Sequence, residues 1–259
     1  AALAGNYKDC NHNGTLYYSQ DDVNQFVLEA HAAGLQIALS CIGPRAIDQA
    51  LTAFSSAFEA VGAGNHRHRL ELFVLPTSDQ IENAIALGLI LSMRPNYDAL
   101  WGGSQGMYAA NMGSGWQSCN PVGQVIKKGG MYEQRLGGHY GRSNQFRQIF
   151  DSGIIVCGGS EYSVTPLNPL TSIRSCLLHS QETQRISLYE AFKTYTVNGA
   201  YANFAETSIG QIREGFQADL VVLDEDPFAV SPQDLGSIGI TMTMKNGQIV
   251  YSKGEAEWK

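Results

Sequence analysis

One pattern of apolar and polar positions recurs three times along the chain. An amphipathic helical stretch ends at a glycine, and a short apolar run follows at once. Glycine suits the left-handed position that ends a helix, and apolar runs without alternation are typical of strands buried on both faces. The pattern therefore predicts three helix–strand units in series. Their glycines are Gly34, Gly88 and Gly153, and their predicted strands are 35–39, 89–93 and 154–157.

A fourth unit lies between the first two of these. The stretch Pro44–Val61 carries apolar residues at helical spacing on one face, and Arg69–Val74 is predicted to be a strand. Such alternation predicts parallel strands joined by right-handed crossovers. A closed barrel needs eight strands and roughly 250 residues for the barrel alone, whereas this sequence offers four. The predicted fold class is α/β, a partial (β/α) TIM-type barrel.

Two helices have recognisable start signals. Ser19 is a good N-cap for the first helix, and Asp22 stands at the capping-box position. Ser187 and Glu190 form the same box at the start of a last helix, which we predict to run over 187–204.

After this last helix the alternation of helices and strands ends, and short predicted strands follow one another. The runs 218–223, 240–245 and 248–251 are predicted to be strands, and Lys245-Asn246-Gly247 is a hairpin signal. Asp219 is expected to shape a turn or cap this region. We therefore predict two parts, a partial barrel over residues 1–209 and a small C-terminal β appendage over 210–259.

A long insert separates the third and fourth predicted strands. Residues 96–144 are rich in Gly, Ser, Asn and aromatic residues and include His139. Long loops in compact domains are usually functional or disordered. The aromatic content favours an ordered loop over the ends of the strands.

Composition narrows the function classes. The 259 residues suffice for one large domain with a small appendage. A net charge of −7 without a basic cluster disfavours nucleic acid or a membrane surface as a partner. The longest apolar run, near 84–93, is too short to span a bilayer, and no signal peptide is visible. Five scattered cysteines without a CxxC pair argue against disulfides or a zinc knuckle, which favours a reducing cytoplasm.

Several motifs in a fixed order carry a family resemblance. Gly215–Asp224 reads G-F-Q-A-D-L-V-V-L-D and resembles the segment that closes amidohydrolase-superfamily enzymes. Tyr195–Ala200 resembles the helix before that segment. Residues 31–38 and 43–48 resemble the branch of long metal-dependent amidohydrolases that contains N-substituted formamide deformylases. The resemblance runs from about Ser19 to Tyr251.

This resemblance implies a fold and an activity. The family's barrel holds metal, zinc among others, at the C-terminal ends of its strands. A His-x-His comes from strand 1, a bridging residue from mid-barrel, one His each from strands 5 and 6, and an Asp from strand 8. The four strands here match strands 5 to 8, so the chain resembles the C-terminal half only, and its appendage would be part of a composite β-sandwich. The implied reaction is hydrolysis of C–N bonds in amides, formamides or cyclic amides.

Three positions depart from the family's ligands. The strand-5 His falls at Ser40, the strand-6 His falls at Leu72, and the strand-8 Asp falls at Glu161. Catalytic zinc needs about three protein ligands from His, Asp, Glu or Cys. Ser40 is a poor ligand and Leu72 is none. We therefore expect no metal and no other cofactor on this chain alone.

The remaining candidates each have a structural alternative. Glu161 is the catalytic candidate, or a relic carboxylate of the pocket wall. Glu71 belongs to the pocket or is a paired structural carboxylate. Arg94, which replaces the Gln of a family "Q-P", could clamp an acidic ligand or pair with Glu71 or Glu161. The pocket candidates are Ser40, Glu71, Arg94, Asn96 and His139.

The histidines offer no evident site. None aligns with a family ligand, and His66 and His68 precede a strand, at the end opposite the family's active site. Cys41 and Cys157 sit in apolar runs and are expected to be inert core thiols.

Three hypotheses of function follow. The first is a C–N hydrolase that takes metal ligands from another chain or from an N-terminal half. The second is a non-catalytic relative that binds a small amide-type ligand. The third is a half barrel that self-assembles, because four parallel strands leave two edges that proteins normally cover. The second and third are compatible with each other.

Overall fold

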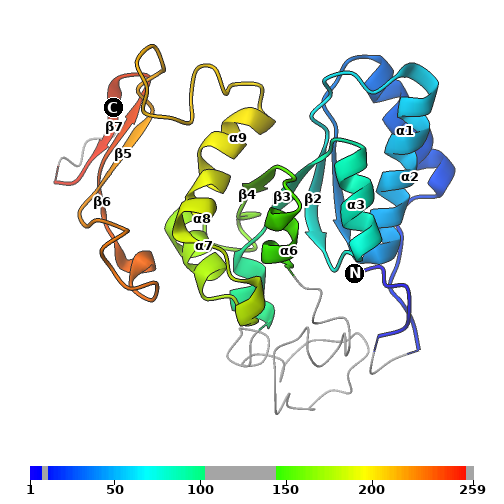
Figure 1. Ribbon diagram of the computed structural model, residues 1–259, viewed down its shortest axis with the longest axis horizontal. Helices are drawn as coiled ribbons and strands as arrows, with labels where there is room; N and C mark the ends of the chain where they lie inside the picture. The colour runs from blue at the N-terminus through cyan, green and yellow to red at the C-terminus, as the bar shows by residue number, and fades with distance from the viewer. Residues whose placement is uncertain (8–10, 103–143, 255–259) are drawn as a thin grey trace.

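The computed structural model describes residues 1–7, 11–102 and 144–254, and the fold is α/β with a parallel sheet (Figure 1). Helices and strands alternate through the first part of the chain. The elements before the insert are α1 (Gln20–Ala32), β1 (Ala38–Ile42), α2 (Pro44–Val61), β2 (Arg69–Val74), α3 (Ser78–Ala86), β3 (Ile90–Met93) and a π-helical turn (Asp98–Gly102). The next elements are α6 (Phe146–Asp151), β4 (Val156–Gly158), α7 (Pro169–Leu177), a 3-10 turn (Glu182–Gln184), α8 (Leu188–Tyr195) and α9 (Val197–Ala202).

The first sheet has the predicted parallel arrangement. Its strand order is β1-β2-β3-β4, so each strand pairs with the next one along the chain. Helix α2 and strand β2 have the predicted bounds, and α2 begins with Pro44 at its first position, where the fixed φ of proline is already helical. The capping boxes at Ser19 and Ser187 are both formed.

Four strands begin later than predicted, among them β3 at Ile90 rather than at 89 and β5 (Leu220–Leu223) at Leu220 rather than at 218. β1 starts at Ala38 rather than at 35, and β4 starts at Val156 rather than at 154. The residues after Gly34 close the preceding helix, because the Leu35 amide still donates to the Ala30 carbonyl. The Gln36 side chain then bonds two backbone carbonyls, those of Arg67 and Ala202. The strand ladder begins only where Ala38 lies opposite a partner residue.

The helical part after β4 also differs from the prediction. The expected single helix over 187–204 is two helices, because Thr196 leaves the helical region with φ −125° and ψ −99°. Helix α7 was not predicted. Its signals were Asn168, whose side chain accepts from the backbone N–H groups of Leu170 and Thr171, and Pro169 at the first helical position.

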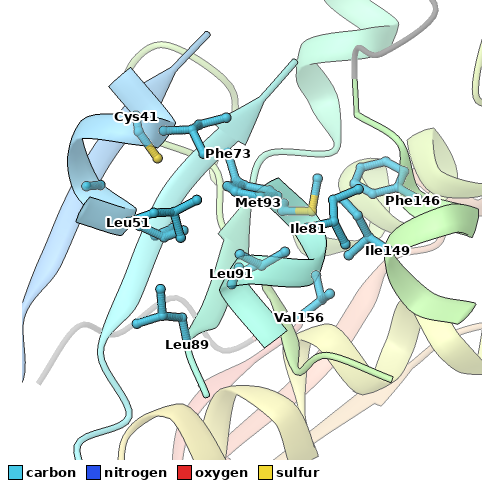
Figure 2. Close-up of a cluster of buried hydrophobic side chains, with 14 of the residues drawn as sticks. Cys41, Leu51, Phe73, Ile81, Leu89, Leu91, Met93, Phe146, Ile149 and Val156 are labelled. Atoms are coloured by element: carbon cyan, nitrogen blue, oxygen red, sulfur yellow. The ribbon is translucent and has the colours of Figure 1, made fainter. Parts of the chain in front are cut away.

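The core lies between the parallel sheet and its helices. Leu70, Leu91 and Val156 share one level of the sheet, and helices α2, α3 and α6 pack on them (Figure 2). Full burial of such a side chain stabilises by about 1.5–3 kcal/mol. Other members of this core are Ile47, Phe54, Phe73, Ile81, Met93, Phe146 and Ile149.

A second, antiparallel sheet follows, as predicted. It contains β5 (Leu220–Leu223), β6 (Ile240–Lys245) and β7 (Gln248–Ser252), after which the described chain ends. Asn246 and Gly247 turn between β6 and β7 with φ of 49° and 77°, the signs that a type I′ hairpin turn requires. Asp219 caps this turn, since its carboxylate accepts the Asn246 N–H at 2.6 Å. In Figure 1 helices α7 to α9 lie between the two sheets.

Candidate functional site

Four side chains at one level of the parallel sheet form a row, which we call the polar row. Ser40 lies opposite Glu71, Glu71 opposite Ser92, and Ser92 opposite Cys157. Each follows a strand residue that packs in the helix-covered core. Because successive side chains of a strand point to opposite faces, the polar row lies on the other face of the sheet.

Glu71 is the centre of this row and holds two arginines. Its Oε1 accepts from Nε of Arg69 at 2.9 Å, and its Oε2 accepts from Nη2 of Arg94 at 2.7 Å. Arg94 also donates through Nη1 to the Ser92 carbonyl and hydroxyl, at 2.9 and 3.0 Å. Of the pairings considered for Arg94, the one with Glu71 is therefore formed. Arg69 is a partner that the sequence did not reveal.

The electrostatics of the row follow from these contacts. Burial is the largest influence on the Glu71 pKa and acts to raise it, but hydrogen bonds from Arg69, Ser92 and Arg94 together outweigh it and lower the pKa. Glu71 is thus ionised at neutral pH. Two guanidinium groups around one carboxylate leave the row with one net positive charge.

Two glycines allow the close packing around Arg94. A Cβ at Gly159 would lie 2.8 Å from the Arg94 Nη1, and a Cβ at Gly158 would lie 2.4 Å from the Tyr195 ring. Burial raises the pKa of the Tyr195 hydroxyl. Among the residues that the structure describes, neither that hydroxyl nor the buried Nε of Arg94 has a hydrogen-bond partner.

The three positions that the sequence resemblance predicts to correspond to metal ligands, Ser40, Leu72 and Glu161, lie in different environments. Ser40 is exposed. Leu72 is buried in an apolar cluster with Leu3, Leu75 and Tyr97. The N-terminal segment reaches this cluster because the Ala2 N–H donates to the Ile42 carbonyl at 2.8 Å.

Glu161 is also exposed, and its carboxylate accepts a hydrogen bond from the Tyr97 hydroxyl. These three positions therefore offer a hydroxyl, a hydrocarbon and one hydrogen-bonded carboxylate. That donor set does not fit zinc, which takes about three N, S or O ligands from the protein. Across residues 1–7, 11–102 and 144–254, no group of three His, Cys, Asp or Glu residues could hold a metal ion.

Of the last two pocket candidates, Asn96 does not join the row. Asn96 is buried, and its amide donates to the Ser172 hydroxyl at 2.9 Å and accepts from the Ser175 hydroxyl at 2.8 Å. It therefore fastens the segment after β3 to helix α7. His139 lies outside the described residues.

A buried polar cluster beside α7 was missed from the sequence. Asp98 accepts from the Ser180 N–H at 2.8 Å and from its hydroxyl at 2.7 Å, and lies 3.6 Å from Nε2 of His179. The serine donates to the carboxylate rather than to the imidazole, so this is not a nucleophile–base pair. Asp98 and His179 are 81 positions apart in the sequence, and no motif links them. They come close only in the folded chain, so the sequence carries no signal of this cluster.

Three histidines gather at the opposite end of the sheet, before β2. His68 Nδ1 accepts the Ile37 N–H at 3.0 Å, and its Nε2 faces Nδ1 of His31 at 2.9 Å. His66 Nδ1 accepts the His68 N–H at 2.9 Å. Burial, with neighbouring His66 and His31, lowers the His68 pKa to about 3. This cluster satisfies backbone groups and joins elements.

The chain belongs to the Amidohydrolase family, whose sequence profile matches residues 1–251. It is similar to the amidohydrolase YtcJ of Bacillus subtilis, with 28% identity over 93% of this chain and 42% of that protein. It is also similar to the N-substituted formamide deformylase of Arthrobacter pascens, with 23% identity over 93% of this chain and 41% of that protein. The chain spans less than half the length of these relatives.

Solved structures have the same fold. An uncharacterised metal-dependent hydrolase from Pyrococcus furiosus superposes with a TM-score of 0.68 at 23% identity, covering 88% of this chain and 42% of that one. Its counterpart from Pyrococcus horikoshii gives a TM-score of 0.69 at 20% identity, covering 90% and 43%. None of the described helices is long and apolar enough to cross a membrane.

Proposed function

We propose that this chain is the half of an amidohydrolase barrel that corresponds to strands 5 to 8, and that it binds a small amide-type ligand without metal-dependent hydrolysis. One observation carries the proposal. The positions that the family resemblance matches with metal ligands are, in this chain, an exposed hydroxyl at Ser40, a buried hydrocarbon at Leu72 and, at Glu161, a carboxylate bonded to Tyr97. Without a metal, no group at these positions lowers the pKa of an attacking water.

The test is a panel of amides, formamides and cyclic amides, scored for binding by calorimetry and for turnover by product analysis. We expect binding by at least one class and no turnover, with or without added zinc. Turnover by the purified chain would overturn the proposal.

A second candidate is a C–N hydrolase in which another chain or an N-terminal half supplies the missing ligands. It is favoured by the carboxylate that Glu161 keeps at the end of β4, and by the similarity to an N-substituted formamide deformylase. This reading predicts zinc-dependent turnover that Glu161→Ala abolishes and Glu182→Ala leaves unchanged. Glu182 is a suitable control because its side chain is 82% exposed.

We further propose that a partner covers the two sheet edges, either a second copy of the chain or an N-terminal half. Within the described residues, β1 and β4 each pair with one strand only, and exposed edges of this kind are normally covered. We place the division between the barrel part and the β appendage near residue 210.

We also propose a reducing cytoplasm as the chain's compartment. Cys41, Cys157 and Cys176 are buried free thiols, and burial raises the pKa of each. Inert thiols of this kind suit a protein that does not use disulfides.

A further inference from the structure

We propose that a cavity at the amino ends of β2, β3 and β4 is a second binding site, and that it takes a small, uncharged and mainly apolar molecule. This cavity lies at the end of the parallel sheet opposite to the carboxyl ends of the strands. It is therefore independent of the proposed function, and either can fail without the other.

The cavity has a volume of about 290 Å³. Its walls come from the segment before β2, the turn between α3 and β3, the turn between α6 and β4, and Tyr201 on α9. Ligand sites in proteins begin at about 300 Å³, and a dry cavity of about 150 Å³ already holds benzene. The space therefore suits a molecule of roughly two fused rings.

Three glycines belong to the turns around this cavity. Gly64, Gly88 and Gly153 have φ of 64°, 63° and 80°, a region that other residues rarely adopt. A Cβ on Gly64 or Gly153 would meet no atom within 4 Å, and one on Gly88 would meet only the His66 ring, at 3.8 Å. The turns thus leave open space beside them. Ile85, which also lines the cavity, is 38% exposed, so a small molecule can enter from solvent.

The charges around the cavity are balanced. Arg67 lines it, and both terminal nitrogens of Arg67 donate to the Glu206 carboxylate, at 2.7 and 2.6 Å. The same guanidinium lies over the Tyr201 ring, 3.9 Å from its centroid. His66 is neutral at pH 7, because burial lowers its pKa. A charged ligand would lose hydration here without gaining a counter-charge, so the cavity selects an uncharged one.

The walls offer apolar contact and one hydrogen-bonding side chain. The Asn65 Oδ1 accepts a long hydrogen bond from Nε of Arg67, at 3.4 Å. Because an amide oxygen has two lone pairs, it can also accept from an N–H of the ligand. The Tyr201 ring favours edge or offset contact with a second ring. The aliphatic side chains of the cavity are Ile85, Leu89, Ile90, Ile154 and Ile155.

The experiment compares three probes that share one ring system. Indole is uncharged and carries one N–H, whereas indole-3-carboxylate is negative and tryptamine is positive at pH 7. NMR titration of the full chain should give indole an affinity at least about tenfold higher than that of either charged probe. The amide signals of Gly88 and Gly153 should be among those that shift. Equal affinity for the three probes, no binding of indole, or shifts confined to other parts of the chain would each overturn the inference.

Variants locate the site. Ile85→Trp places a larger side chain in the cavity and should weaken indole binding by about tenfold or more. Leu28→Trp is the matched control, because Leu28 also lies on a helix and is 37% exposed. It should bind indole like the parent chain. A folded Ile85→Trp chain with unchanged affinity would overturn the assignment to this cavity.

Two further measurements keep the outcomes separate. Thermal unfolding shows whether each variant is folded, and if Ile85→Trp does not fold, the signals that shift in the parent chain decide the location. Both variants should bind the amide panel of the proposed function like the parent chain, since that ligand uses the other end of the sheet. Amide binding without indole binding would overturn this inference alone, and indole binding without amide binding would overturn the proposed function alone.

Discussion

Glu71 shows at the scale of one residue how the fold holds a mostly buried carboxylate. Its side chain is 15% exposed and is held by two guanidinium groups. Removing one partner of a mostly buried ion pair leaves the others uncompensated. We predict that Glu71→Gln lowers the free energy of unfolding by about 3 kcal/mol, measured by urea denaturation at pH 7. Glu182→Gln, at the surface, should change it by less than about 0.5 kcal/mol.

The same residue predicts a pH dependence. The Glu71 pKa is lowered in the folded chain. The ionised Glu71 therefore stabilises the folded chain above the pKa that Glu71 has when unfolded, and this stabilisation is lost as the pH falls through its folded pKa. The difference in stability between the parent chain and Glu71→Gln should therefore shrink between pH 5 and pH 3. A difference that stays constant would contradict this role.

At the scale of single residues, the sequence predicted the chemistry of individual side chains better than the contacts between them. It predicted that Ser40 and Leu72, at positions that the resemblance matches with histidine ligands, do not hold a metal, because a hydroxyl is a poor zinc ligand and a hydrocarbon is none. It offered the Arg94–Glu71 pair as one of several options. It gave no sign of the contacts Tyr97–Glu161 or Asp98–Ser180, because these join segments that only the fold brings together.

Among the elements, the junction of α1, α2 and β2 is built from stacked rings. His66 stacks on Phe58 and on His68 with 4.5 Å between ring centroids in each case, and His68 stacks on Phe54 at 5.2 Å. Burial lowers the pKa of both His66 and His68. The charged groups that act on them are the imidazoles themselves and that of His31.

This junction predicts acid sensitivity. A histidine whose pKa is lowered by folding binds fewer protons in the folded chain than in the unfolded chain. Its full contribution to the free energy of unfolding is present above the unfolded pKa of about 6.5, and that contribution falls as the pH drops towards the folded pKa. We predict a slope of up to about 1.4 kcal/mol per pH unit per histidine below pH 6. His68→Phe should flatten the slope, and His12→Phe, an exposed position, should not. Urea denaturation between pH 4 and pH 7 measures both.

Helix α8 gives a prediction from capping. The Ser187 hydroxyl accepts the Glu190 N–H, and the Glu190 carboxylate accepts the Ser187 N–H at 2.8 Å. Ser187→Ala should cost about 1 kcal/mol of unfolding free energy, measured by thermal or chemical denaturation. Thr77→Ala, at the matching box of α3, should cost a similar amount. No loss in either variant would contradict the capping role.

Local signals predicted element types well and some boundaries poorly. Glycines 34, 88 and 153 do end helices, each with positive φ. The start of β1 was misplaced because the Leu35 N–H, the Gln36 side chain and the Ile37 N–H all bond outside the strand ladder, and residue types alone do not reveal hydrogen-bond partners. The break at Thr196 was missed because the helical pattern continues across it.

At the scale of the whole molecule, the two edge strands of the parallel sheet, β1 and β4, predict a partner. The parallel sheet has β1 at one edge and β4 at the other, and Figure 1 shows α7 to α9 between β4 and the second sheet. If a second copy covers the edges, light scattering at micromolar concentration should give a mass of about twice the 28.1 kDa of one chain. A monomer would exclude self-assembly and leave an N-terminal half as the partner.

The overall architecture was predicted because it depends on repeated local patterns. Alternation of helices and strands fixed the parallel sheet, and the hairpin signal at Asn246-Gly247 fixed the second sheet. The polar row was not predicted as a unit, because its members come from four strands and their common level depends on register. Only two of its residues, Ser40 and Glu71, were candidates beforehand, together with the neighbouring Arg94.

The central claim is that this chain does not hold the family's metal with its own residues. Elemental analysis of the purified chain, before and after incubation with zinc, tests it most directly. We predict far less than one zinc per chain under both conditions, because Ser40 and Leu72 stand where the family resemblance implies two imidazole ligands. About one zinc or more per chain, abolished by Glu161→Ala, would contradict the account and restore the hydrolase reading.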